Sequence, residues 1–197
     1  MSMMFRAFLA TAFLALVACA TPPEAAPKGN IGFSGTPLKL DVASVTIDDR
    51  YNPPGKAPNV EQLYEVTPSA VAERWLQTRV VAVGSRGIAV LTIYDARVVE
   101  ERQVVKGGLT GFFGDQIDSK IVGTLRGELQ VTTEGTDGSR SMHKAGVNAK
   151  SEQTILQSAD LNERDRAYFN LINKLTAEFD RLLTAEVTRT MGSALRP

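Results

Sequence analysis

The fold of this chain is decided by the stretch IVGTLRGELQVTT, residues 121–133. Its apolar residues fall on one parity: Ile121, Leu125, Leu129 and Val131. Because successive side chains of a strand point to opposite faces, this alternation predicts a strand with one buried face. Gly123 and Gly127 share the apolar parity, which leaves room for a helix or an aromatic ring packed closely above them.

A hairpin continues from this strand. Residues 134–140 contain Asp137-Gly138, a dipeptide strongly favoured in two-residue turns. Residues 142–151 then alternate again, with three small apolar residues facing one way: Ala145, Val147 and Ala149. The sequence therefore predicts two antiparallel strands joined by a tight turn.

The longest predicted element is a helix that begins after Asp160 and reaches about Met191. Asp160 is a good capping residue, and Glu163 three positions later completes a capping-box pattern. A buried face recurs at helical spacing: Phe169, Ile172, Leu175, Phe179, Leu182, Leu183 and Val187. A stripe of this kind indicates core packing rather than a ligand groove.

A second helix is predicted from Pro68 to the residues before Gly84. Thr67 suits the capping position, Pro68 the first helical position, and Gly84 the residue beyond the end. The apolar stripe between them is broad: Val71, Ala72, Trp75, Leu76, Val80, Ala82 and Val83. We expect Trp75, the lone tryptophan, to be a packing anchor of the core.

Two further strands are predicted. Residues 38–47 alternate with a change of parity near Ala43, which suggests a bulge or a twist. Residues 88–99 are rich in Val, Ile and Tyr and favour a strand that could continue through residue 105. The stretch 48–58, with three prolines, is predicted to be a surface loop of no assigned role.

These elements predict an α+β fold. The order is strand, helix, strand, strand, strand, helix, in a single mixed sheet of about four strands with both helices on one face. The first and second strands are joined through a helix, so that pair is expected to be parallel. Residues 38–197 are long enough for one such domain.

Composition excludes one class of partner. The chain has 22 basic and 22 acidic residues among 197, and no stretch is strongly basic. Phosphate backbones are bound by clustered positive charge, so we expect no nucleic acid partner.

No motif for catalysis, a metal or a cofactor is recognisable, so the sequence predicts a protein that is not an enzyme. His143, the lone histidine, is expected on a strand surface. The glycine-rich residues 107–111 lack the lysine and the strand-to-helix context of a phosphate loop. Asp115, Asp118 and Glu128 are interpreted as solvated charges.

One patch is unusual for an exposed connection between strands. Phe112 and Phe113 are consecutive and are flanked by Gly111 and Gly114. Two interpretations remain open: the loop folds back and buries both rings, or the rings form an apolar tip that contacts a partner protein or a membrane surface.

The N-terminal segment carries the most specific motif. Arg6 precedes an apolar run over residues 7–17, interrupted only by Thr11, and the lone cysteine, Cys19, ends the string Leu-Val-Ala-Cys. The run is shorter than the roughly 20 residues of a spanning helix and suits a signal peptide. The string resembles the lipobox of bacterial lipoprotein precursors. An alternative is a soluble secreted protein with an accidental Cys19.

The resemblance implies that residues 1–18 are removed as a signal peptide and that Cys19 is acylated. Residues 19–37, rich in Ala, Pro and Gly, would be a flexible lipidated tether, and residues 38–197 the periplasmic domain. The residue after the cysteine is Ala20 rather than Asp, which in the enterobacterial sorting pattern implies the outer membrane, at its periplasmic face.

The predicted order of elements is similar to that of small envelope lipoproteins, such as the LPS-assembly lipoprotein and the auxiliary lipoproteins of ABC-type lipid transporters. This resemblance implies an accessory subunit of an envelope assembly or lipid-transport complex. An alternative is a lipid or small-molecule binding lipoprotein with a cavity between helices and sheet, lined by small residues: Gly123, Gly127, Ala145 and Ala149. An enzyme acting on envelope material is the least favoured class.

Overall fold

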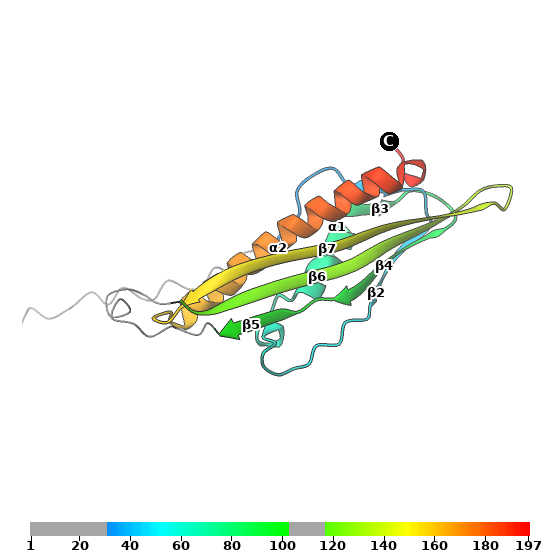
Figure 1. The fold of residues 1–197 in the computed structure, drawn as a ribbon. Coiled ribbons are helices and arrows are strands. Elements are labelled where there is room, and N and C mark those ends of the chain that lie inside the picture. Colours follow the sequence, from blue (N-terminus) through cyan, green and yellow to red (C-terminus); the bar gives the residue numbers. More distant parts are fainter. Residues whose placement is uncertain (1–30, 103–116) are drawn as a thin grey trace, which may run out of the picture.

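The computed structural model describes residues 31–102 and 117–197 of the chain (Figure 1). Cys19, Phe112, Phe113 and the glycine-rich residues 107–111 lie outside these ranges, so the predictions about them stay predictions. Within the described ranges, none of the helices combines the length and apolar character needed to span a bilayer.

The main sheet is mixed and contains five strands. Their bounds are β2 Ser44–Asp49, β4 Ile88–Asp95, β5 Val98–Arg102, β6 Ile117–Glu134 and β7 Arg140–Leu156. β2 lies parallel to β4, and β6 lies antiparallel to β4, β5 and β7. β4 and β5 pair with successive parts of β6, so together they occupy one position and the sheet is four positions wide. The predicted α+β class and the parallel first pair are confirmed.

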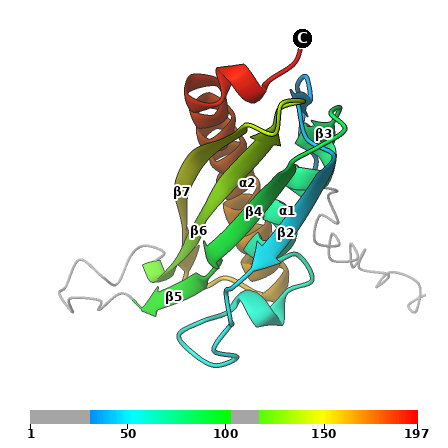
Figure 2. The same cartoon turned by 90° about the vertical axis from the view of Figure 1, so that its right-hand side faces the viewer.

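Two helices cover one face of this sheet (Figure 2). α1 spans Pro68–Arg79 and α2 spans Leu161–Thr190. The Thr67 side chain caps α1, and Asp160 with Glu163 forms the predicted capping box at the start of α2. The α2 residues that enter the core are mostly apolar and include Leu171, Ile172, Leu175, Phe179, Leu183 and Val187.

The hairpin forms as predicted and is longer at both ends. Leu129 pairs with Ala145 across it, and Gly138 takes a positive φ of 84° in the turn. A Cβ atom on Gly123 would lie 3.2 Å from Leu175 Cδ2, so α2 does pack closely above this glycine. The interpretation of Gly127 was wrong, because a Cβ there would lie 2.7 Å from the Thr92 carbonyl oxygen of β4. Gly127 accommodates a neighbouring strand rather than a helix.

The predicted first strand is two strands in two sheets. β1 spans Leu38–Leu40 and β2 begins at Ser44, so the change of parity near Ala43 marks a passage between sheets and not a bulge. The predicted end of the first helix was also wrong. α1 ends at Arg79, and Val80–Ala82 forms β3, which pairs in parallel with β1. The β-branched Val80 and Val81 favour this extended conformation.

Gly84 follows β3 and has a different role from the predicted helix cap. A Cβ atom there would lie 2.7 Å from the backbone nitrogen of Val42, so only glycine permits this approach between the two segments. The Gly84 amide donates to the Val42 carbonyl at 3.0 Å.

The C-terminal residues complete the small sheet on the other side of β1. The 3-10 helix η3, Gly192–Ala194, follows α2. The Asp41 amide donates to the Ala194 carbonyl, and the Arg196 amide donates to the Lys39 carbonyl, both at 2.9 Å. β1 is therefore held between β3 and the end of the chain.

Candidate functional site: the pocket beside the N-terminal strap

Residues 31–37, which we call the strap, lie against the two helices. Ile31 is buried, and its carbonyl accepts a hydrogen bond from Arg74 Nη1 at 2.9 Å. The Thr36 carbonyl accepts from Arg79 Nη1 at 2.7 Å. Gly35 has a φ of 124°, and a Cβ atom on it would lie 2.9 Å from Arg79 Nη1. The sequence placed these residues in the tether, and in the structure they bind the domain.

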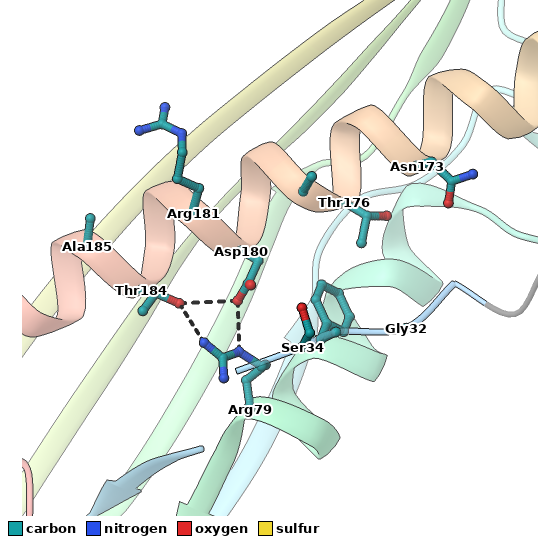
Figure 3. A pocket seen from close by; sticks show the side chains of 11 residues that line it. Gly32, Ser34, Arg79, Asn173, Thr176, Asp180, Arg181, Thr184 and Ala185 are labelled. Atoms are coloured by element: carbon teal, nitrogen blue, oxygen red, sulfur yellow. Dashed lines mark hydrogen bonds and ion pairs between the residues drawn. The ribbon is translucent and has the colours of Figure 1, made fainter. Parts of the chain in front are cut away.

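A pocket of about 540 Å³ opens between the strap and α2 (Figure 3). The strap supplies Gly32, Phe33 and Ser34, and α1 supplies Arg79 at its last position. The α2 residues of its wall are mostly small or polar: Asn173, Thr176, Ala177, Asp180, Arg181, Thr184 and Ala185.

A buried ion pair closes the floor of the pocket. Arg79 is 5% exposed, and its Nε lies 2.9 Å from Asp180 Oδ1. The same oxygen accepts from Trp75 Nε1 at 2.7 Å and from Thr184 Oγ1 at 3.2 Å. Trp75 is buried as predicted and meets the Phe179 ring edge-on, with centroids 5.9 Å apart. The network therefore ties α1, α2 and the strap together.

Two acceptors of this wall have no hydrogen-bond partner among the described residues. All three hydrogen bonds to Asp180 end on Oδ1, and within the described ranges none reaches Oδ2, on a side chain that is 21% exposed. Thr176 is 4% exposed, and its Oγ1 has no hydrogen-bond partner. Only Thr176 Oγ1 is a buried atom, and a buried polar group without a partner is uncommon in folded proteins and calls for an explanation.

A second carboxylate with several hydrogen bonds, Glu61, is not among the residues that line the pocket. It begins the 3-10 helix η1, Glu61–Leu63, and is 2% exposed. Tyr51 Oη donates to its Oε1 at 2.6 Å, and the Val98 amide donates to its Oε2 at 3.0 Å. Asn59 Nδ2 adds weaker contacts to both oxygens, at 3.2 and 3.4 Å. Glu61 thus anchors the loop of residues 48–58, for which no role is predicted from the sequence, to the start of β5.

The contacts between Glu61 and Tyr51 shift the pKa values of both side chains. Burial alone would raise the pKa of Glu61, but the hydrogen bonds from Tyr51, Val98 and Asn59 outweigh it and lower the pKa below its usual value. Burial and the neighbouring carboxylate raise the pKa of Tyr51. Glu61 is therefore held ionised by the fold.

The other residues singled out from the sequence lie away from the pocket. His143 is half-buried on β7, with Nε2 3.3 Å from Ser193 Oγ. Glu128 pairs with Lys144 at 2.8 Å across the hairpin. Among residues 31–102 and 117–197, no three His, Cys, Asp or Glu residues are grouped closely enough to hold a metal ion.

Sequence reasoning missed the pocket, although two signals were present. Thr176, Asp180 and Thr184 recur every four residues and form a polar stripe beside the apolar face of α2, and Trp75 and Arg79 have the same spacing on α1. Ile31 and Phe33 are also apolar residues in a segment interpreted as solvated.

Comparison with known proteins gives weak likenesses only. No protein family model matches the chain, and no curated protein matches it. The crystal structure of rare lipoprotein B from Shewanella oneidensis is 13% identical, covers 74% of this chain and 95% of its own, and has a TM-score of 0.36. A minor lipoprotein from Acinetobacter baumannii is 14% identical over 80% of this chain and 99% of its own, with a TM-score of 0.35.

A third structure, protein XCC0632 of Xanthomonas campestris from the DUF330 family, is 10% identical over 80% of this chain and 94% of its own, with a TM-score of 0.32. Two of the three structures are named as bacterial lipoproteins. Scores at this level do not assign a function.

Proposed function

We propose that this chain is an acyl-anchored lipoprotein of the bacterial envelope, facing the periplasm from the outer membrane. In this proposal it acts as a non-catalytic accessory subunit of an envelope assembly or lipid-transport complex. The observation that carries the proposal is the position of Cys19, the lone cysteine, directly after an apolar run of signal-peptide length. Several acyl chains on one residue make release from a membrane negligible, because each buried methylene contributes about 0.8 kcal/mol.

The strap adds a geometric argument for a role close to the membrane. The first described residue, Ile31, is already buried against the domain. The chain from Cys19 to Ile31 spans at most about 40 Å at full extension, by the reach of an extended backbone. An acylated Cys19 would therefore keep the domain next to the bilayer, where it could meet a membrane complex but not travel across the periplasm.

The alternative of a ligand cavity between helices and sheet is less well supported. The small residues named for it lie where secondary structure elements pack together: Leu171 and Leu175 cover Gly123, and Ala145 and Ala149 are fully buried. These residues seat α2 on the hairpin. The pocket described above lies instead beside the strap.

Acylation is tested by producing the full-length chain and its Cys19→Ser variant in a Gram-negative host with an alkyne-labelled fatty acid. We expect label on the unaltered chain, recovered with outer membranes, and no label on the variant. An unlabelled, soluble chain would contradict the proposal and favour the secreted alternative.

The accessory role is tested by in-cell photocrosslinking from position 112, one of the two phenylalanines predicted to contact a partner or the membrane. We expect a specific adduct with an envelope protein in the acylated chain and loss of that adduct in Cys19→Ser. Adducts to lipid alone would contradict the accessory role and favour membrane contact or lipid binding. A normally folded chain with no adduct would contradict the contact role of Phe112.

A further inference from the structure

We propose that the pocket beside the strap binds a primary ammonium group carried on a short alkyl chain. The proposal concerns a ligand site on the domain itself and does not depend on acylation or on a partner complex. It rests on the hydrogen-bonding capacity of the pocket, on its charges and on its apolar walls.

The unpaired groups of the wall favour a ligand rich in hydrogen-bond donors. Asp180 Oδ2 is an anionic acceptor on the pocket wall that no described residue reaches, and Thr176 adds a hydroxyl without a partner. Asn173 and Ser34 line the same space, and Figure 3 shows the Ser34 side chain directed from the strap towards α2. An ammonium group has three donors and no acceptor, which matches a wall that offers acceptors.

The charges of the lining permit a cation. Arg79 is bound through Nε to Asp180 and through Nη1 to Thr36, and it is almost completely buried. Arg181, at the rim, makes a two-pronged pair with Glu178, at 2.7 and 2.9 Å. Both positive charges are thus compensated. A cation at Asp180 Oδ2 would lie nearer to the carboxylate than to the guanidinium, which approaches the opposite oxygen.

The apolar part of the pocket suits the alkyl chain. Phe33, Ala177 and Ala185 line it, and an aromatic face also attracts an ammonium group. A volume of about 540 Å³ lies within the range of small-molecule sites. The ammonium could belong to a free small amine or to a lysine side chain of a partner protein, since both present the same chemistry.

The proposal is tested by NMR titration of the 15N-labelled full-length chain with n-pentylammonium, and with n-pentanol as a neutral probe of the same length. We expect saturable shifts of the Ser34, Thr176 and Asp180 amides with the amine only. Equal shifts with pentanol, or no shifts with either probe, would overturn the proposal. Nα-acetyl-lysine N-methylamide then separates the two sources: binding of pentylammonium alone indicates a free amine, and binding of both probes shows that a lysine side chain is accepted.

Two variants check how the ligand is recognised without breaking the buried ion pair. Thr176→Val removes the unpaired hydroxyl at nearly constant shape, and we expect it to weaken amine binding about threefold or more, the effect of one hydrogen bond. Arg181→Gln removes a rim cation, and we expect it to strengthen amine binding by about twofold. Weaker amine binding in Arg181→Gln would show that the positive charge at the rim does not oppose the bound group, and it would overturn the proposal.

Discussion

Glu61 and Asp180 are both carboxylates that join distant segments, yet the fold uses their oxygen atoms differently. Glu61 is 2% exposed, and both of its oxygens accept hydrogen bonds from the protein. Asp180 receives all of its donors on Oδ1 and keeps Oδ2 at the edge of a pocket. Both oxygens of Glu61 are thus used by hydrogen bonds within the fold, whereas one oxygen of Asp180 is left without a donor from the described residues.

The largest expected effect comes from breaking the ion pair of the pocket. Arg79→Met leaves Asp180 partly buried without its cation and frees the Thr36 carbonyl, and we expect a loss of about 3 kcal/mol in the free energy of unfolding. The measurement is urea denaturation followed by the fluorescence of Trp75, which contacts the same carboxylate. Arg181→Met removes an exposed cation that pairs with Glu178. It is the matched control and should cost much less, because solvent screens exposed ion pairs. Equal losses in the two variants would mean that burial adds nothing to the pair.

Removing the charge of Glu61 should cost less, because the side chain of the variant keeps one acceptor. In Glu61→Gln an amide NH2 group replaces one oxygen that accepts hydrogen bonds, so at least one donor loses its acceptor. We expect a loss of about 2 kcal/mol in the free energy of unfolding, measured by the same denaturation. Glu65→Gln, on the exposed surface nearby, is the control for loss of a negative charge. If Glu61→Gln were as stable as the unaltered chain, the fold would not need both oxygens of Glu61 as acceptors, and Glu61 would not differ from Asp180 in this respect.

A smaller loss of stability is expected from substitution of Gly35 in the strap. A comparison with Gly55 separates the cost of backbone strain from the cost of the contact with Arg79. Gly35→Ala places a Cβ atom 2.9 Å from Arg79 Nη1 at a positive φ, and we expect a loss of about 1.5 kcal/mol. Gly55→Ala shares the positive φ but meets nothing within 4 Å, so it should cost only the strain, about 1 kcal/mol. Thermal denaturation of both variants gives the difference. A Gly35→Ala protein more stable than Gly55→Ala would show that the strap does not rest on Arg79.

The dependence of stability on acid pH should show whether Glu61 is held ionised by the fold. The pKa values of Glu61 and Glu100 are lowered in the folded state, the latter because hydrogen bonds from Ser119 and Arg164 outweigh its burial. Their stabilisation is therefore complete above the unfolded value of about 4.3 and is lost as the pH falls through the folded values. We expect the free energy of unfolding to decline below about pH 4.5, and to decline less steeply in Glu61→Gln. Identical slopes would show that Glu61 is not held ionised.

The smallest expected effect has the opposite sign. Thr176→Val removes a buried hydroxyl that has no partner among residues 31–102 and 117–197, so the folded chain should gain about 0.5 kcal/mol. High-precision calorimetry is the measurement. A clear loss of stability would mean that the hydroxyl has a partner in solution, and the pocket would then lack one of its two unpaired acceptors.

Local signals in the sequence were sufficient for most of the fold. The capping box at Asp160, the cap at Thr67 and the Asp137-Gly138 turn each act within a few residues, and all three form as predicted. The small sheet could not be predicted in this way, because β1 pairs with β3 about forty residues away and with residues near 195. The sequence shows the small sheet only through the change of parity near Ala43. The residues of β3, Val80–Ala82, fit the apolar stripe of a helix as well as a strand, so they do not reveal it either.

The candidate site was harder to predict from the sequence than the fold. Its residues come from the strap, α1 and α2, and none of them forms a motif with its neighbours in sequence. Composition favoured a solvated tether for the strap, while Ile31 and Phe33 pack onto the domain. A few apolar residues were enough to override the composition of the surrounding segment.

The position of β1 between β3 and residues 194–196 also sets an order of events during synthesis. β1 is made well before residues 194–196, its partners on one edge. Lys39 Nζ donates to the Pro197 carbonyl across a separation of 158 residues, a contact that forms only after all the elements between the two residues have been made. The main sheet and α2 can assemble before that point, whereas this edge of β1 is paired only afterwards.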